Sequence, residues 1–262
     1  MARYALRRLV VTLPILAVIS LGAFWAADNI TKPTAAFAVN PRISAADRAA
    51  YVEALGLDLP FWTRYFHWLG NFVTGDLGTS LVQNGAEVWL LVRTALANTL
   101  VLVAVAVTLS LAVGIAVGTL GAARRRSLID IAATTTSYFG LSIPVFWLGL
   151  MLQLFFGLYL ANWLGVAPPL LPTAGIYSPD QEGFDLIDRA RHLAVPTMAL
   201  SLQLIAVYSR YMRAGLLDVL GAEYVRTAYA KGLSERVVVL RHGVRNALIP
   251  VTTQAALGIG FR

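Results

Sequence analysis

The residue types that most often carry chemistry are few in this sequence and lie far apart. The 262 residues include no cysteine, which excludes disulfides, thiolate zinc sites and cysteine nucleophiles. His67, His192 and His242 fall in separate segments without a second ligand at metal spacing, so each is predicted to be a surface or interface histidine. The two lysines, Lys32 and Lys231, do not follow a G-x-x-x-x-G-K-[ST] phosphate loop. The chain is therefore not expected to hydrolyse ATP itself.

Two further kinds of chemistry are disfavoured. Ser142 and Ser201 lack a G-x-S-x-G setting, so an intramembrane enzyme is the weakest functional hypothesis. Ion-coupled carriers commonly keep an ionisable residue at mid-membrane, where it is costly. Here Asp130 and Asp218 lie at or beyond the predicted helix ends, and no predicted span has a central charge. Ion-coupled transport is therefore disfavoured, and any energy for such work would have to come from elsewhere.

A basic stretch is the most informative part of the chain. Seven of the 21 Lys and Arg residues lie between residues 210 and 245. Residues 223–231 are predicted to form a short helix, with an acidic residue at its positive end and a basic one at its negative end. Gly232 then suits a left-handed position, Leu233 the apolar position after it, and Ser234 the cap of a following helix. Two helices are thus expected to meet at a sharp turn.

This hairpin is predicted to dock as a compact knob into a groove on a cytoplasmic partner. Ala228 and Ala230 are small enough for close packing, and Tyr224 and Tyr229 are expected to project. A DNA-binding helix-turn-helix is the competing interpretation, but its second helix would run through Asn246 into an apolar span, so no nucleic acid partner is expected. A solvated positive loop would explain the charge but not the Gly-Leu-Ser sequence at the predicted turn.

The elements that position this hairpin are membrane spans. Apolar residues make up 58% of the chain, charged residues 13%, and the mean hydropathy is +0.67, so the excess apolar surface requires lipid or protein around it. A span needs about 20 apolar residues. Five spans are predicted, the third ending before Pro168, Pro169 and Pro172: Leu9–Ala27, Thr94–Ala123, Ala132–Trp163, Leu193–Ser209 and Asn246–Phe261. Because the last reaches the end of the sequence, the chain is expected to lack a C-terminal segment.

The charges flanking these spans predict their orientation. The N-terminus and the segments 124–130 and 210–245 together carry 13 basic and 4 acidic residues, whereas segments 28–93 and 162–192 carry 7 basic and 10 acidic residues. Cytoplasmic loops are enriched in Lys and Arg, so the N-terminus is predicted to be cytoplasmic. A cleaved signal peptide ending near Ala36-Phe37-Ala38 is the alternative, but its apolar run would be unusually long.

The segment between the first two spans is predicted to hold two helices outside the membrane. Ser44 can cap the first, with Asp47 in its first turn and Gly56 at its end, and Pro60 suits the start of the second. Two interpretations of the second helix stay open, a position among the lipid headgroups and a packed cap over the spans. Its aromatic residues are Phe61, Trp62, Tyr65, Phe66, Trp68 and Phe72.

Several motifs together resemble a known family. The stretch Arg226–Leu233, followed by Arg245–Pro250, is similar to the cytoplasmic "EAA" loop of ABC importer permeases in the dipeptide/oligopeptide/nickel branch. The other matching motifs are Gly56-Leu57-Asp58, Pro60, Trp62, Tyr65, Trp68, Gly75-Asp76-Leu77-Gly78-Thr79-Ser80, Asn98-Thr99-Leu100 and Ser142-Ile143-Pro144-Val145-Phe146-Trp147. Residues 29–33 replace the usual Pro-Gly-Asp-Pro, and the literal Glu-Ala-Ala is absent. The resemblance covers nearly the whole chain.

The resemblance implies an all-α, multi-pass bundle of the type I ABC importer transmembrane fold, in a bacterial or archaeal cytoplasmic membrane. Residues 1–93 are expected to form an N-terminal span and an extracytoplasmic segment, and residues 94–262 the core permease domain. The implied partners are a second permease, two ATPase subunits that bind ATP and Mg²⁺, an extracytoplasmic binding protein and membrane lipid. No cofactor or metal is expected in this chain.

The implied function is a permease subunit for peptides or related solutes, driven by partner ATPases through alternating access. The residues expected to couple it to the ATPase are Glu223, Tyr224, Arg226, Thr227, Ala228, Ala230, Lys231, Gly232 and Leu233. The alternative hypothesis is a membrane scaffold that recruits a cytoplasmic partner without forming a solute pathway. Neither the solute nor the residues that contact it can be named from the sequence.

Overall fold

The protein is mainly helical in the residues that its computed structural model describes. These are residues 2–30, 49–50, 52–53, 56–80, 83, 85–181 and 183–260. The predicted cap at Ser44, Asp47 and most of the departure at residues 29–33 lie outside them. Apart from an isolated bridge between Thr79 and Glu87, the regular structure described is helical, which confirms the all-α prediction. The chain divides into two compact units, Met1–Leu96 and Ala97–Arg262.

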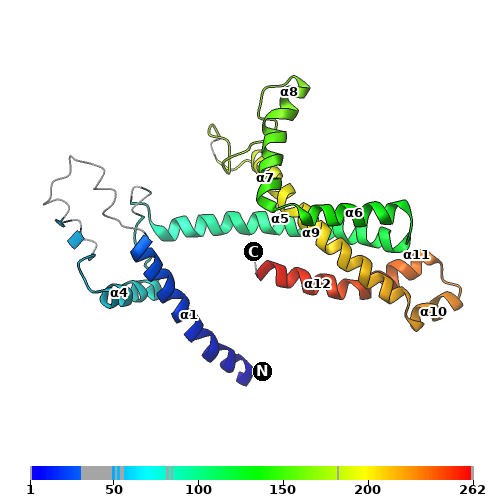
Figure 1. Cartoon of the computed structure of the whole chain (residues 1–262), viewed down its shortest axis with the longest axis horizontal. Coiled ribbons are helices and arrows are strands. Elements are labelled where there is room, and N and C mark those ends of the chain that lie inside the picture. The colour runs from blue at the N-terminus through cyan, green and yellow to red at the C-terminus, as the bar shows by residue number, and fades with distance from the viewer. Residues whose placement is uncertain are drawn as a thin grey trace. The chain divides into compact units, whose positions relative to one another are not determined.

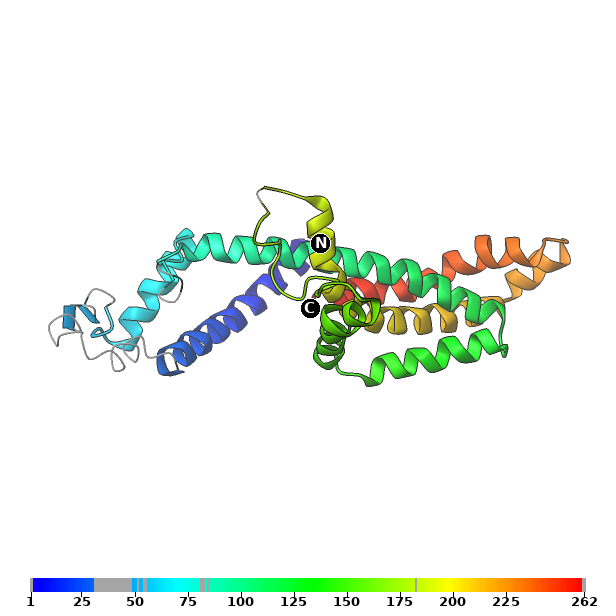
Figure 2. The ribbon, with the colours of Figure 1, turned by 90° about the horizontal axis from the view of Figure 1, so that it is seen from above.

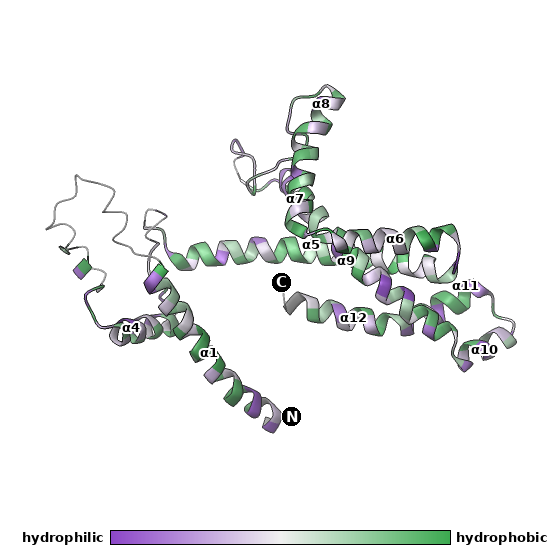
Figure 3. Ribbon diagram, in the orientation of Figure 1, coloured by the Kyte–Doolittle hydropathy of each residue, from purple (hydrophilic) through white to green (hydrophobic). Residues whose placement is uncertain are grey.

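Four helical stretches among the described residues are long and apolar enough to cross a membrane. They are Leu6–Ile30 within α1 (Ala2–Ile30), Val88–Ala123 (α5), Val145–Leu164 (α7, η1 and α8) and Leu186–Leu220 (α9). Green hydrophobic colouring dominates α7 and much of α5 (Figure 3). At 1.5 Å per residue, the 36 residues of α5 are about 54 Å long and exceed the thickness of the hydrocarbon core. The multi-pass prediction is confirmed.

The prediction of one continuous span over residues 132–163 is wrong. Helix α6 (Leu128–Ser142) ends before Pro144, and α7 (Val145–Leu154) begins after it. Ile143 between them is extended, with φ −88° and ψ 124°. Proline lacks an amide hydrogen and disfavours helical geometry in the residue before it, so the chain breaks here. Figure 1 shows α7 leaving the end of α6 in a new direction.

The predicted fifth span is not among the four candidates. It lies in α12 (Arg245–Gly260), whose 16 residues amount to about 24 Å. This helix follows directly on α11 (Glu235–Val237) and the π-helix η2 (Val238–Val244). As predicted, the helix after the hairpin therefore continues through Asn246 into an apolar stretch.

Within the first unit, α4 (Phe61–Thr74) packs one aromatic face on α1. Both terminal nitrogens of Arg64 donate to Asp28, at 2.5 and 2.6 Å, and the hydroxyls of Ser20 and Tyr65 lie 2.9 Å apart. The ring of Phe24 lies 5.5 to 5.6 Å from three rings of α4, those of Phe61, Tyr65 and Trp68. Another face of α4 leaves Trp62 and Phe66 exposed. One face thus suits the packed cap and the other the headgroup region.

Within the second unit, α5 and α9 approach each other along a stripe of small residues. The stripe repeats every four residues on α5 and is buried: Ala106, Ser110, Gly114, Gly118 and Ala122. A Cβ atom on Gly118 would lie 2.4 Å from the Ser209 carbonyl oxygen, and one on Gly114 would lie 2.8 Å from the Tyr208 Cβ. Only residues without a large side chain allow two helix backbones this close in a membrane.

The core of the second unit lies where α9 meets α12 and the adjacent turn of η2. Tyr208, Met212 and Leu216 of α9 are fully buried against Ala247 and Val251 of α12. These residues recur every four positions along α9, which places them on one helix face. Because α9 also packs on α5, α6 and α7, it is the central helix of the unit.

Candidate functional site

The predicted hairpin forms with the turn geometry expected of it. Helix α10 (Glu223–Ala230) ends at Lys231, and Gly232 follows in the left-handed region at φ +80°. The Gly232 amide donates to the Tyr229 carbonyl at 2.9 Å, and the Leu233 amide donates to the Ala228 carbonyl at 3.3 Å. These are the two hydrogen bonds of a Schellman motif. The predicted helix and its glycine turn are confirmed.

The second arm begins as predicted but without the expected side-chain cap. Ser234 precedes α11 in an extended conformation, φ −64° and ψ 148°, yet its side chain makes no capping hydrogen bond. The helix widens at once into η2, which contains Arg241 and His242. Only the backbone of Ser234 therefore fulfils the predicted role.

Apolar residues hold the two arms of the hairpin together. Val225 and Ala228 of α10 are buried against Val238 of η2, with Leu220 at their edge. Ala228 thus packs inside the hairpin, whereas Ala230 is exposed. Both were predicted as close-packing positions toward an ATPase. The structure places only Ala230 on the outer surface.

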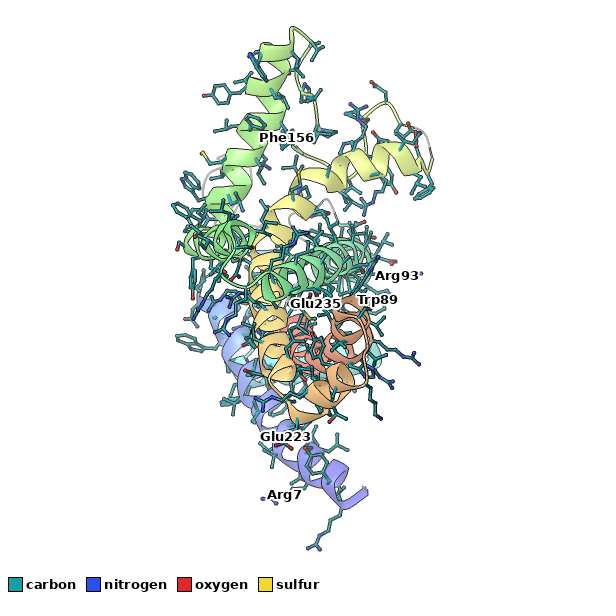
Figure 4. The ribbon with its side chains drawn as sticks, turned by 90° about the vertical axis from the view of Figure 1, so that its right-hand side faces the viewer. Arg7, Trp89, Arg93, Phe156, Glu223 and Glu235 are labelled. Atoms are coloured by element: carbon teal, nitrogen blue, oxygen red, sulfur yellow. The ribbon has the colours of Figure 1, made fainter. Side chains whose placement is uncertain are left out.

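The outer surface of the hairpin is polar and aromatic. Both predicted tyrosines project, because Tyr224 is 47% exposed and Tyr229 is 43% exposed. The Tyr224 hydroxyl also accepts a hydrogen bond from the Asn246 side chain at 2.9 Å, which fixes α10 to the start of α12. The other predicted coupling residues that are exposed are Glu223, Arg226, Thr227, Lys231, Gly232 and Leu233. Figure 4 draws these side chains, with Glu223 and Glu235 labelled at the starts of α10 and α11.

An ion pair beside the hairpin, between buried Asp130 and half-buried Arg213, was not predicted. Arg213 of α9 donates from Nε and Nη2 to the two carboxylate oxygens of Asp130, at 2.5 and 2.8 Å. Asp130 lies in the first turn of α6 and also accepts from the Arg126 amide at 2.9 Å. The Arg213 guanidinium, followed by the Arg126 amide, lowers the pKa of Asp130 from 3.8 to about 2. The pair ties α6 to α9 by a bidentate contact.

The sequence carries no signal for this pair. Asp130 was noted only as a charge near a helix end, and Arg213 only as one member of the basic stretch. The two residues are 83 positions apart, and only the antiparallel packing of α6 on α9 brings them together. Both views show the α5–α6 turn and the hairpin at the same end of the second unit (Figures 1 and 2).

A second polar cluster lies at the other end of α9. Arg189 is buried and donates to the Asn98 side chain at 2.7 Å and to the Ile176 carbonyl at 3.3 Å. This contact accounts for the asparagine of the Asn98-Thr99-Leu100 motif. Asp188 accepts from the amide and hydroxyl of Ser178, at 2.9 and 2.6 Å. The loop after α8 is thereby fastened to the start of α9.

The same cluster contains one of the histidines that were predicted to lie at a surface or an interface. His192 is buried, not on a surface, and its Nδ1 lies 2.9 Å from the Asp188 carbonyl oxygen and 3.5 Å from the carboxylate. His67 is exposed and His242 is half-buried. In the part of the chain that the structure describes, no three His, Asp or Glu side chains gather as metal ligands would.

Known proteins resemble this chain over nearly its whole length. Residues 112–261 match the family described as "binding-protein-dependent transport system inner membrane component". The oligopeptide transport system permease protein AppB of Bacillus subtilis is 40% identical over 97% of this chain and 77% of its own length. The dipeptide transport system permease protein DppB of Alkalihalophilus pseudofirmus is 33% identical, over 99% and 80%.

A third relative is the oligopeptide transport system permease protein OppB of Mycobacterium tuberculosis, which is 36% identical over 99% of this chain and 79% of its own length. The matched region 112–261 includes α6, α9, the hairpin and all of α12, so the site described above falls within it. Together with four apolar helices, these matches confirm the family and the membrane setting predicted from the sequence. The chain belongs to the family of binding-protein-dependent transport system inner membrane components.

Proposed function

We propose that this chain is a permease subunit that moves peptides inward across the inner membrane, using ATP hydrolysis by separate subunits. Three relatives with 33–40% identity carry names that describe oligopeptide or dipeptide permeases, which supports a peptide-like solute. In this proposal residues 1–93 supply the first span and an outer segment. Residues 94–262 supply the core, with its coupling loop at 210–245.

The hairpin is the observation that carries this proposal. It is a short helix closed by a Schellman turn, its two arms are held together by Val225, Ala228 and Val238, and its outer surface is polar and aromatic. A knob that is rigid inside and polar outside can transmit a displacement from a partner instead of absorbing it. We assign its exposed residues to contacts with an ATPase subunit that binds ATP and Mg²⁺.

The charge distribution supports a cytoplasmic position for the hairpin and the N-terminus. The end of the second unit that holds the hairpin also holds Arg124, Arg125 and Arg126 in the α5–α6 turn. Positive residues accumulate in cytoplasmic loops. The remaining partners in the proposal are a second permease subunit and an extracytoplasmic binding protein that delivers the solute.

Site-specific cross-linking tests the proposed contact. The chain contains no cysteine, so Arg226→Cys introduces a single thiol on the outer surface of α10. In the assembled importer, with a cysteine series introduced along the predicted cleft of the ATPase subunit, we expect a cross-link whose yield changes between the nucleotide-free and ATP-bound states. SDS gel analysis measures it.

Phe184→Cys is the matched control, because Phe184 is exposed in the loop before α9, at the other end of that helix. It should give no cross-link to the ATPase subunit in either state. A cross-link from Phe184→Cys together with none from Arg226→Cys would reverse the proposed orientation and remove the coupling role of the hairpin.

A further inference from the structure

A recess that the hairpin does not use lies between α6, α9 and α12. It has a volume of about 560 Å³, within the range of small-molecule sites. Six of its lining residues offer polar or cationic groups, and they come from all three helices: Thr134, Tyr138, Arg210, Tyr211, Arg213 and Gln254. The apolar lining includes Leu141 and Val207. Converging polar groups in a partly apolar recess are typical of a binding site.

Two arginines border this recess, and they differ in their partners. Arg213 is neutralised by its bidentate contact with Asp130. Arg210, one turn earlier on α9, is exposed, and no carboxylate of the described residues lies within ion-pair distance of it. Its guanidinium carbon lies 4.6 Å from the centre of the Tyr138 ring. The recess therefore contains one cation that is positioned by an aromatic ring and not neutralised by an acid.

The position of Arg210 along α9 makes its charge significant. Ten residues separate it from the end of the helix at Leu220, which corresponds to about 15 Å. Arg210 directly follows the predicted span Leu193–Ser209, so it lies where that span meets the proposed cytoplasmic side. Charged side chains of a spanning helix are costly in lipid and face a bundle interior or a water-filled cavity. The open recess provides that cavity.

We propose that this recess binds the terminal carboxylate of the transported peptide, with Arg210 as the cation that receives it. The inference rests on the proposed peptide transport and adds the contact group. A guanidinium held against an aromatic face keeps its planar set of N–H donors for an anion, and it pairs with a carboxylate through two parallel hydrogen bonds. The neighbouring hydroxyls and the Gln254 amide can complete the hydrogen bonding of a peptide end.

The chemistry favours a carboxylate end over a side chain as the recognised group. Every linear peptide with a free C-terminus carries this carboxylate, whatever its sequence. No carboxylate is among the described residues that line the recess, and Asp130, the partner of Arg213, is buried and already occupied. A single uncompensated cation beside apolar walls suits a ligand that has one constant anionic group and side chains that vary.

The test compares a peptide with its C-terminal amide in proteoliposomes that contain the complete importer and its binding protein. The pair is chosen so that the wild-type complex transports both forms. Arg210→Gln should lower the ratio of acid to amide uptake about tenfold, the loss expected when a charged hydrogen-bonding partner is removed. Arg210→Lys, which keeps the charge but not the planar donors, should give an intermediate ratio. The selectivity of the binding protein is common to all variants and cancels in this comparison.

Arg124→Gln is the control, since Arg124 is exposed in the α5–α6 turn and does not line the recess. It should leave the ratio unchanged. Equal uptake losses for acid and amide in Arg210→Gln would overturn the inference, and so would an unchanged ratio. If that equal loss came with less anionic phospholipid retained in native mass spectrometry, a lipid headgroup would replace the peptide as the ligand. Absence of ATP-driven uptake of either form by the wild-type importer would instead refute the proposed function.

Discussion

Gly232 shows how one residue can fix the shape of the docking hairpin. Its φ of +80° lies in a region that costs a residue with a side chain roughly 1–2 kcal/mol, and most for a β-branched one. No neighbouring atom lies within 4 Å of a Cβ built at this position. Backbone conformation, and not space, therefore requires glycine here.

Replacing Gly232 should separate coupling from folding. We expect Gly232→Val to abolish or strongly reduce ATP-driven uptake while membrane insertion stays normal, because the strain is confined to the exposed turn. Uptake by reconstituted vesicles and the yield of membrane-inserted protein measure the two effects. Gly232→Asn is the matched variant, since asparagine tolerates the left-handed region better, and it should retain most of the uptake. Equal uptake by both variants would show that the turn geometry is not needed.

The contact between Asp130 and Arg213 is the strongest polar link between α6 and α9. Asp130→Asn removes the charge and leaves the Arg213 guanidinium without its bidentate partner. Hydrogen bonds to charged groups contribute roughly 1.5–3 kcal/mol, so the free energy of unfolding of the variant should fall by about this amount. The variant should therefore unfold at a lower temperature. Thermal unfolding of the purified protein in detergent measures the change.

The same pair predicts a pH dependence. The pKa of Asp130 is lowered to about 2 in the folded protein, so the pair contributes its full stabilisation above the ordinary value of 3.8 and loses it as the pH falls through about 2. The stability difference between wild type and Asp130→Asn should be constant from about pH 5 to 8 and shrink below pH 4. A difference that grew with acidity would contradict this account.

At the scale of elements, the small-residue stripe of α5 determines how close α9 can come. A Cβ atom on Gly118 would meet the Ser209 carbonyl at 2.4 Å and the Met212 Cβ at 2.7 Å. Because these are backbone and first side-chain atoms, they cannot move aside without moving the helix. The stripe thus positions α9, which carries Arg213, Arg210 and the hairpin beyond it.

Gly118→Leu should push α5 and α9 apart. Overpacking of this kind costs typically 1–3 kcal/mol, and occasionally more, so we expect a lower unfolding temperature and less assembled importer after purification. Size-exclusion chromatography and thermal unfolding measure the two effects. Gly22→Leu in α1 is the matched control, because a Cβ at Gly22 meets no atom within 4 Å. An equal effect of the two substitutions would show that close packing at Gly118 is not the cause.

Element boundaries show where local signals succeed and where they fail. The end of α10 was predictable because a Lys-Gly-Leu sequence has one favourable turn geometry. Pro144 carried an equally local signal for the break between α6 and α7, but the long uncharged run around it concealed that signal. Ser234 marks the right position, yet its side chain makes no capping bond, since the helix can begin without one.

At the scale of the whole chain, α9 connects the features proposed to matter. Its first turns hold Asp188, Arg189 and His192 at one end, and Arg213 and the hairpin lie toward the other. Within the second unit, a displacement of the hairpin would be passed to α6 through the Asp130 ion pair and to α12 through the shared apolar core. This arrangement suits a subunit whose two ends respond to different partners.

The sequence by itself determined the membrane class, most of the spans, the hairpin and the family, because composition, charge runs and turn chemistry are local properties of neighbouring residues. Only the tertiary structure decided that Ala228 faces inward, that His192 is buried, that Asp130 binds Arg213 and that Arg210 borders a recess. Each of these depends on which helix faces lie together. A single sequence contains no signal that two residues tens of positions apart are in contact. Packing of α9 against its neighbours supplies that information.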